Sequence, residues 1–493
     1  MLNQRARLLR FLYHNKVILC VTPVILSLCL LLRALTVDVN ISISEAEVEY
    51  ETDNRDDWLT FPRSTGFRFV LLDAGIFRAK NRSKIISFGI FEKDEAMFRA
   101  WYASKKHQRW RLIEGRSTDF RTISPKKIKS VHRQVSSHYF LISSSSIIHV
   151  AVIFQRKNYF WVANLSQSIL PASWGSLVES VVGIRTPMAV EPFKCGSTNI
   201  SIWPFPSSLI CVPEDLDFYL WQIPFSQFRE CHFEDIVYPF NEKYNVASAG
   251  NLKYENLALQ EIMRITKELR MTTMIFCGTL LGWYRQCDYI VESRDIDVVI
   301  MADEYKQEFF QRLFRSPALT LYSRLGTPEL GLEFRTYYRG FWRSVWLDIF
   351  LMYQTKPHQL STYLMIGNFW YELRHPLREG VCSAELFGVL VYVPCNYADF
   401  VVADYGNDGW FPPYSGNIYA NVNMKLIQKL KETEMAYLKH VYTKFRCENA
   451  SDMWGCDPMP PKVLNSKFYH KVKAKKRLKV NSENESAGLS TVT

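Results

Sequence analysis

The sequence contains no pair of cysteines in a C-x-x-C spacing, which argues against a zinc ribbon or a thioredoxin-like redox site. Its first 16 residues contain no acidic side chain, and no A-x-A cleavage site follows the apolar run that begins at Val17. A content of 48% hydrophobic and 14% aromatic residues excludes a disordered chain. The 493 residues suffice for two or three domains with a large core.

The apolar run predicts a membrane anchor. Residues 17–32 are apolar or small, with four basic residues before them and Arg33 after them. The run is longer than that of a cleaved signal peptide, so we expect a retained signal-anchor transmembrane helix over 17–36. A buried helix is the alternative, and the flanking charges disfavour it. The basic flank predicts a cytosolic tail over 1–16 and a lumenal body, and the short span suits early secretory membranes.

Two features agree with a lumenal body. Nine cysteines follow the predicted anchor, an odd number that leaves one thiol free or intermolecular in an oxidising compartment. None of the N-x-S sequons precedes the anchor; they lie at Asn40, Asn81, Asn164, Asn199, Asn449 and Asn484. The net charge of +11 is concentrated in the cytosolic tail and in residues 467–480. It therefore gives no reason to predict nucleic-acid binding.

The chain divides by composition. We expect a stem over 37–60, a β-rich domain over 61–240, a catalytic domain over 241–446, and a C-terminal tail over 447–493 that is partly disordered. Helical periodicity predicts helices over 251–269, 303–314 and 423–445, and apolar runs predict strands over 272–277, 345–352 and 389–394. Alternating helices and strands indicate an α/β fold for the catalytic domain.

Two aspartates interrupt one of the apolar strands. Asp295 and Asp297 stand two residues apart, so their side chains share a face of the strand. Like charges at this spacing need a cation between them, and Mg²⁺ or Mn²⁺ accepts such oxygen ligands. Asp348 is the only isolated acid on a later predicted strand, and it would complete the metal site. The D-x-D triplet alone is weak evidence, because Asp215 and Asp217 also form one.

Phosphate-binding groups accompany the acid pair. Gly278 and Thr279 follow the preceding strand, where backbone N–H groups and a hydroxyl suit a phosphate. Arg285 and Arg294 could neutralise the same phosphates. The structural alternative is that Arg294 pairs with Asp295 at the start of the strand and that Asp348 is an ordinary buried acid. The ordered set favours a nucleotidyltransferase-like site.

The segment "GTLLGWYRQCDYIVESRDIDVVI" resembles the signature of the bacterial LicD phosphorylcholine transferases, and it resembles the fukutin family more closely. Further fukutin-like stretches are "LDIFLMY" and "VYVPCNYADFVVADYGNDGW", together with Cys382 and Cys395. The resemblance covers about residues 250–420. Unlike the bacterial pattern, the chain has Gln286, Val291 and Arg294 in place of a basic residue, a proline and an acid. The missing acid argues against a second tightly held metal ion and against choline.

The resemblance implies a nucleotidyltransferase-like fold and a Golgi membrane transferase, with the endoplasmic reticulum as a further location. Such an enzyme moves ribitol 5-phosphate from a CDP-ribitol-like donor onto an O-mannosyl glycan, as on dystroglycan, and works beside other Golgi glycosyltransferases. The implied roles are metal binding and catalysis by Asp295, Asp297 and Asp348, and donor binding by Gly278, Thr279, Arg285, Arg294, Tyr405, Gly406 and Trp410.

Two alternatives to this function remain open at the level of sequence. A GT-A glycosyltransferase would use the D-x-D motif with manganese, but it needs a long nucleotide-binding unit before the motif. A non-catalytic Golgi scaffold or glycan-binding partner would have no reason to keep three carboxylates on apolar strands. We also predict disulfides Cys382–Cys395 and Cys447–Cys456, because each pair is close in sequence and flanks a short connection.

Overall fold

The structure is a computed structural model that describes residues 65, 68–72, 85–104, 110–122, 130–143, 147–165, 187–196, 210–231, 252–290, 293, 295–338, 345–407 and 423–441. The predicted cytosolic tail, anchor, stem and C-terminal tail lie outside these residues. The described residues all belong to one compact unit. Among the described residues, no helix has both the length and the apolar character needed to span a membrane.

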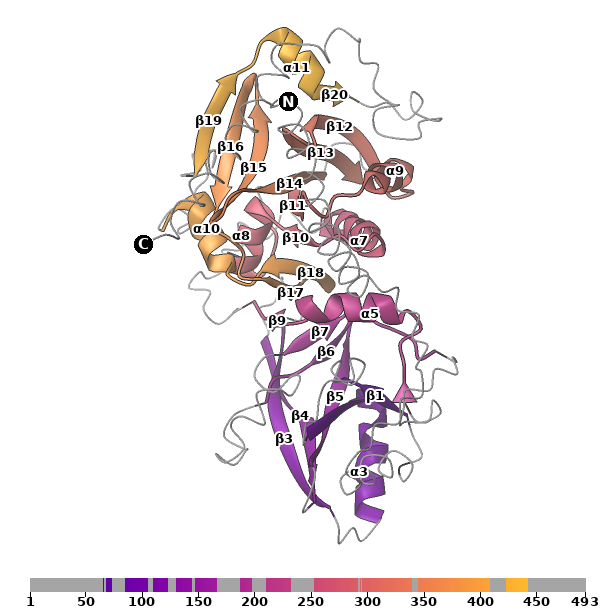
Figure 1. Cartoon of the computed structure of the whole chain (residues 1–493). Helices are drawn as coiled ribbons and strands as arrows, with labels where there is room; N and C mark the ends of the chain where they lie inside the picture. Colours follow the sequence, from indigo (N-terminus) through magenta and orange to yellow (C-terminus); the bar gives the residue numbers. More distant parts are fainter. Residues whose placement is uncertain are drawn as a thin grey trace, which may run out of the picture. The chain divides into compact units, whose positions relative to one another are not determined.

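The first sheet has eight strands and lies in the N-terminal part of the described chain (Figure 1). Its main path runs β3-β4-β5-β2-β1-β8, and β6 and β7 continue from β5. The strands are β1 (Phe69–Leu71), β2 (Ile85–Phe91), β3 (Arg111–Thr122), β4 (Ser130–Ile142), β5 (Ile147–Arg156), β6 (Tyr159–Val162), β7 (Met188–Val190) and β8 (Ile210–Cys211). The β-branched and aromatic runs of this region therefore form strands, as predicted.

The second sheet has twelve strands and carries the acid pair. Its main path runs β19-β16-β15-β14-β11-β10-β18-β17-β9, and β13, β12 and β20 branch from β14. The strands are β9 (Phe228–Arg229), β10 (Thr273–Ile275), β11 (Asp295–Met301), β12 (Leu319–Thr327), β13 (Gly331–Tyr338), β14 (Trp346–Lys356), β15 (Gln359–Ile366), β16 (Phe369–His375), β17 (Val381–Leu386), β18 (Val389–Pro394), β19 (Met424–Lys429) and β20 (Lys439–Val441).

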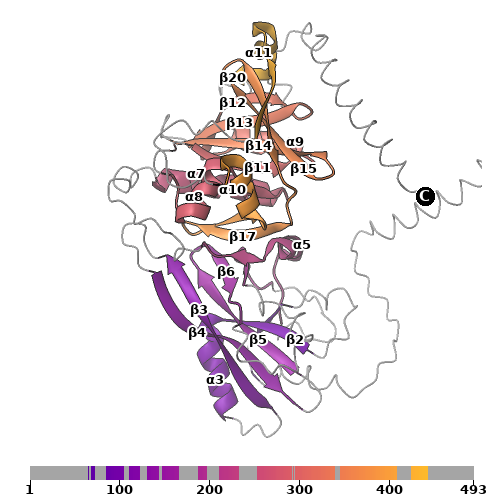
Figure 2. The same ribbon diagram turned by 90° about the vertical axis from the view of Figure 1, so that its left-hand side faces the viewer.

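Helices cover the centre of the second sheet on both faces. Figure 1 shows α7 and α9 on one side of β10, β11 and β14, and α8 and α10 on the other; the latter two face the viewer in Figure 2. The helices are α3 (Glu95–Ser104), α5 (Leu216–Gln222), α7 (Leu252–Glu268), α8 (Cys277–Gln286), α9 (Gln307–Arg315), α10 (Tyr397–Tyr405) and α11 (Glu432–Leu438), with 3-10 turns η2 (Glu92–Asp94) and η5 (Ile223–Phe225).

Several sequence predictions are confirmed in this domain. Helix α7 lies within the helix predicted over 251–269, and it buries Ala258, Ile262 and Ile265, each at most 1% exposed. β10, β14 and β18 and helix α9 also lie where the apolar patterns placed them. Because helices cover both faces, the central strands can be almost continuously apolar, and polar residues on them become conspicuous. A mixed α/β fold follows.

The predicted helix over 423–445 is wrong. This segment forms strand β19, the short helix α11 and strand β20. β19 pairs antiparallel with the open edge of β16, and this pairing satisfies the backbone hydrogen bonds of the segment. An isolated helix would have to form all of its hydrogen bonds within itself. Glu434 accepts a hydrogen bond from the Lys431 N–H at 2.8 Å, which fixes the start of α11 after the strand ends. Tertiary pairing overrides the helical periodicity here.

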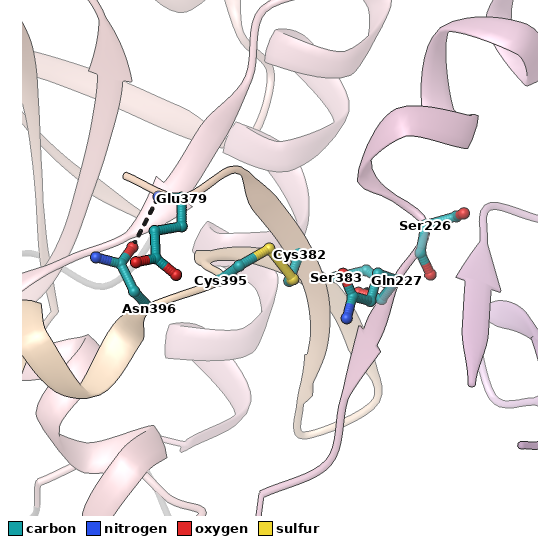
Figure 3. Close-up of a disulfide and its surroundings, with 7 residues drawn as sticks. All are labelled: Ser226, Gln227, Glu379, Cys382, Ser383, Cys395 and Asn396. Atoms are coloured by element: carbon teal, nitrogen blue, oxygen red, sulfur yellow. Dashed lines mark hydrogen bonds between the residues drawn. A yellow bond between two sulfur atoms is a disulfide. The ribbon is translucent and has the colours of Figure 1, made fainter. Parts of the chain in front are cut away.

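Backbone pairing crosses the domain boundary expected near residue 240. β9 pairs in parallel with β17 of the second sheet. Ser383 N–H donates to the Gln227 carbonyl at 2.9 Å, and the Ser383 hydroxyl donates to the Ser226 carbonyl at 3.1 Å. Figure 3 shows these residues beside the Cys382–Cys395 disulfide. The last strand before the expected boundary therefore belongs to the sheet that carries the acid pair.

Three disulfides join described cysteines. Cys382–Cys395 is confirmed; it links β17 to the end of β18, where the Cα atoms are 5.0 Å apart. Cys195–Cys211 and Cys231–Cys287 are pairings that the sequence reasoning did not specify. Among the cysteines that the structure describes, Cys277 is the free thiol. Cys447–Cys456 lies outside the described residues and stays a prediction.

Candidate functional site

The three predicted acids meet at the centre of the second sheet. β11 and β14 run in parallel, and their register places Asp297 directly opposite Asp348. Asp295 lies two residues before Asp297 on the same face of β11. One carboxylate oxygen from each acid lies within 4.8 Å of the other two. The structure therefore brings together three side chains that come from two segments about fifty residues apart in the sequence.

The start of helix α8 holds Asp297 in place. Gly278 N–H donates to Asp297 Oδ2 at 3.2 Å, and the backbone N–H of Asp297 donates to Thr279 Oγ1 at 2.9 Å. A Cβ on Gly278 would lie 3.4 Å from Asp297 Oδ2, in van der Waals contact with the carboxylate. Cys277, the first residue of α8, has a positive backbone φ of 41°. In this structure, therefore, the Gly278 N–H and the Thr279 hydroxyl oxygen orient Asp297.

Two further charged residues lie beside the triad, and the sequence reasoning missed both. Arg335 lies opposite Asp348 on the antiparallel neighbour β13 and pairs with it through two nitrogens, Nε lying 2.7 Å from Oδ1. Glu333, two residues earlier on the same face of β13, is only 4% exposed. The alternation of Glu333 and Arg335 with Leu332 and Phe334 was the available signal, but it does not reveal which strand is the neighbour.

The carboxylates of the acidic cluster are buried close together, so that ionising all of them is unfavourable. Burial raises the pKa of Asp297 well above its ordinary value, and the charges of Asp295 and Asp348 raise it further. Burial also raises the pKa of Asp348, against the opposing effect of Arg335. Burial and the nearby Asp348 raise the pKa of Glu333 to about 8. One guanidinium does not compensate this many carboxylates, so a further cation would stabilise the site.

The cluster fits a hard divalent cation. All of its donors are carboxylate oxygens, which are the ligands that Mg²⁺ and Mn²⁺ prefer, and Asp295, Asp297 and Asp348 can reach one ion together. These three residues would hold the ion. No histidine or cysteine belongs to this triad, so the set does not resemble a zinc site.

The other predicted donor-binding residues lie around α8 and α10 where the structure describes them. Arg285, on α8, bonds the Gln286 side chain through Nε and Nη2. Tyr405 ends α10; burial raises the pKa of its hydroxyl, and the charge of Asp297 adds to the rise while Arg285 opposes it. Gly406 ends the helix with a φ of 78°. Arg294 and Trp410 lie outside the described residues.

Asp404 and His375 form a second buried pair. Asp404 on α10 is 1% exposed, and its Oδ1 accepts a hydrogen bond from Asn423 at 2.8 Å. The His375 ring lies 3.6 Å from the same oxygen. Burial raises the pKa of Asp404 to about 7 and lowers that of His375 to about 3, so the histidine is neutral. The fukutin-like stretch contained Asp404, but the sequence gave no reason to single it out.

The second D-x-D triplet has a structural explanation. Asp215 caps helix α5 by accepting the Phe218 N–H at 2.8 Å, and it pairs with Arg270 at 3.0 Å. Asp217 lies in the first turn of that helix, exposed to solvent, where a negative charge is favourable. These acids lie on a helix rather than on adjacent strands, so they do not converge on one point.

The pKa shifts predict how stability depends on pH in the absence of metal. Asp297 and Glu333 keep protons in the folded state that the unfolded chain releases at an ordinary carboxyl pKa of about 4. The contribution of these two acids to the free energy of unfolding should therefore fall as the pH rises from about 4 towards 8, while the buried neutral His375, whose pKa is lowered to about 3, contributes in the opposite direction below about pH 6.5. Mg²⁺ should reverse part of the fall, because it binds the ionised folded form.

Urea unfolding at a series of pH values, with EDTA or with Mg²⁺, measures this dependence. Asp404 and Asp288, whose pKa values burial raises to about 7, contribute to the same fall but lie outside the triad. Hence Mg²⁺ should restore only part of the stability, and Asp297→Asn should flatten the curve measured in EDTA. A curve insensitive to Mg²⁺ would contradict a divalent site.

Comparison with known proteins gives a consistent result. Residues 270–396 match the domain family described as LicD/FKTN/FKRP, nucleotidyltransferase domain. Ribitol-5-phosphate transferase FKTN is 25% identical over 291 residues in Mus musculus and 24% over 287 residues in Homo sapiens. Each match covers 57% of this chain and 59% of the relative. The uncharacterized protein T07A5.1 of Caenorhabditis elegans is 28% identical over 217 residues, covering 42% of this chain and 55% of the relative.

The three acids on parallel strands and the Gly-Thr helix start lie within the segment that matches this nucleotidyltransferase-domain family. The similarity to the mammalian FKTN proteins extends well beyond that domain. Both comparisons support the resemblance of this chain to the fukutin family. The chain spans 59% of the length of the mammalian relatives that it matches.

Proposed function

We propose that this protein transfers a phospho-alditol, ribitol 5-phosphate or a close analogue, from a CDP-activated donor to a hydroxyl of an O-mannosyl glycan on a glycoprotein. The observation that carries the proposal is the convergence of Asp295, Asp297 and Asp348 within 4.8 Å beside the start of α8. The FKTN relatives are named ribitol-5-phosphate transferases, which supports ribitol 5-phosphate as the group transferred. A phosphoryl transfer needs this kind of site, because it requires positioning and charge neutralisation more than covalent chemistry.

The roles of the residues follow from their positions. A bound Mg²⁺ or Mn²⁺ would supply charge neutralisation for the diphosphate and the leaving CMP. Asp295, Asp297 and Asp348 would hold that ion, and Gly278 and Thr279 keep Asp297 oriented. The acceptor hydroxyl forms a bond to the distal phosphorus while the bond from that phosphorus to the CMP oxygen breaks. An ionised carboxylate of the cluster accepts the hydroxyl proton, and α10 with Tyr405 borders the donor.

The setting of the reaction is part of the proposal. The basic 1–16 segment and the apolar residues 17–36 support a single-pass membrane protein with its body in the Golgi lumen. The sequons and the three disulfides support an oxidising compartment. An acceptor glycoprotein and other Golgi glycosyltransferases would be its partners.

Turnover by the purified full-length protein in detergent tests the function. CDP-ribitol and an O-mannosyl glycopeptide should yield CMP and a glycopeptide heavier by one ribitol phosphate, and EDTA should stop the reaction. Transfer from a nucleotide-sugar instead would support a glycosyltransferase. Glycopeptide binding without turnover of any donor, in the presence of Mg²⁺ and Mn²⁺, would support a non-catalytic partner; either result overturns the proposal.

A further inference from the structure

The guanidinium of Arg335 lies where a second cation would lie in an acidic centre. It approaches Asp348 from β13, on the side away from β11, and both oxygens of that carboxylate accept from it. Asp348 is thus shared: β11 with Asp295 and Asp297 lies on one side, and Arg335 on the other. In two-metal sites, two ions about 4 Å apart commonly share acidic ligands in this way.

Glu333 completes the second position. Its carboxylate lies 3.8 Å from Arg335 Nη2 and is 5% exposed in the side chain. Arg335 therefore stands between two buried acids, Asp348 and Glu333, while 39% of its own side chain remains exposed. Its guanidinium carbon also lies 5.7 Å from the centre of the Trp346 ring, a contact that helps to hold its orientation.

We infer that Arg335 is a fixed cation that takes the place of a second divalent ion, so that this centre binds one ion rather than two. The inference rests on the proposed metal-dependent function. Asp295 and Asp297 bind the single ion, together with the side of Asp348 that faces them. Asp348 and Glu333 pair with the guanidinium, and its exposed part assists in neutralising the donor phosphates. Arg335 is thus a positioning and charge-compensating residue.

Counting bound Mn²⁺ on the full-length protein tests the inference. Electron paramagnetic resonance and titration calorimetry at mildly alkaline pH should give about one Mn²⁺ per wild-type chain and about two per Arg335→Gln chain. The substitution removes the guanidinium and leaves Asp348, Glu333 and the new amide oxygen as ligands. Arg335→Lys keeps a positive charge and should stay at about one ion.

Arg374→Gln is the matched control. Arg374 is a strand arginine of similar exposure, 35% against 39%, and it pairs with Glu372 at 3.2 Å. The Arg374→Gln protein should bind the same number of Mn²⁺ ions as the wild type. Without metal, Arg335→Gln should also have a lower unfolding midpoint than Arg374→Gln, and Mn²⁺ should raise that midpoint by a larger increment.

The outcomes separate this inference from the proposed function. Wild-type protein that binds no Mn²⁺ would overturn the metal site itself, and with it both proposals. Wild-type protein that binds one ion, with Arg335→Gln also binding one at the same affinity, would overturn the inference alone. Wild-type protein that binds two ions would also overturn the inference alone. If Arg335→Gln folds only with Mn²⁺ present, its ion count is measured in that form.

Discussion

Replacing Asp297 with asparagine is expected to lower transfer activity about a thousandfold or more, while the protein remains folded. Asparagine keeps the shape of the side chain and an oxygen that can accept the Gly278 N–H. It removes the negative charge that would hold the ion against Asp295 and Asp348. CMP release from CDP-ribitol measures the loss.

Stability should move in the opposite direction. Because burial and two like charges raise the pKa of Asp297, the folded state resists its ionisation, and a neutral asparagine relieves that cost at neutral pH. The metal-free Asp297→Asn protein should therefore unfold at an equal or higher urea concentration than the metal-free wild type. Lower activity with equal or greater stability is the combination expected of a metal ligand rather than of a structural acid.

Asp217→Asn is the control for this substitution. Asp217 belongs to the other D-x-D triplet and lies exposed on α5, so both activity and Mn²⁺ binding should stay at wild-type levels. Near-normal turnover by folded Asp297→Asn protein would remove the metal hypothesis. An equal loss at Asp217 would show that the wrong acid pair was chosen.

Replacing Arg156 with methionine is expected to destabilise the protein by roughly 3–5 kcal/mol, the usual cost of removing one partner from a buried ion pair. The Arg156 side chain is 3% exposed; it lies 2.7 Å from Asp119 and 2.8 Å from Glu230, and its guanidinium stacks on the Trp161 ring at 3.6 Å. Methionine fills similar space but leaves the buried carboxylate of Asp119 without this partner.

The same substitution should loosen the connection between the two sheets. Glu230 directly follows β9, which pairs with β17, and the Tyr159 hydroxyl at the far end of the Arg156 network donates to Glu385 on β17. Calorimetric unfolding and proteolysis near residue 230 measure the effect. Increased cleavage there is expected in Arg156→Met.

Arg264→Met is the comparison. Arg264 also bonds two carboxylates, Glu261 at 2.8 Å and Glu268 at 2.6 Å, but its side chain is 49% exposed on α7. Exposed pairs of this kind contribute at most about 1 kcal/mol. If both arginines gave equally small losses, the buried network would not be a major source of stability.

The sequence alone determined the character of the central strands and the position of the acids on them. Apolar runs on β11 and β14 required burial, so Asp297 and Asp348 stood out as charges that needed a reason. The helical periodicity of residues 251–269 likewise specified helix α7 and its buried face. Period and spacing carry this information because they depend only on residues near one another in the chain.

Only the tertiary structure decided which strands are neighbours and in what register. The pairing of β11 with β14 placed Asp297 opposite Asp348, and the pairing of β13 with β14 brought Arg335 into the site. Residues 424–429 became a strand because β16 offered an open edge, although their local pattern favoured a helix. Alternation along a strand fixes which side chains share a face but leaves the partner strand undetermined. Long-range packing makes that choice, and for this protein it determines which charges surround the acid pair.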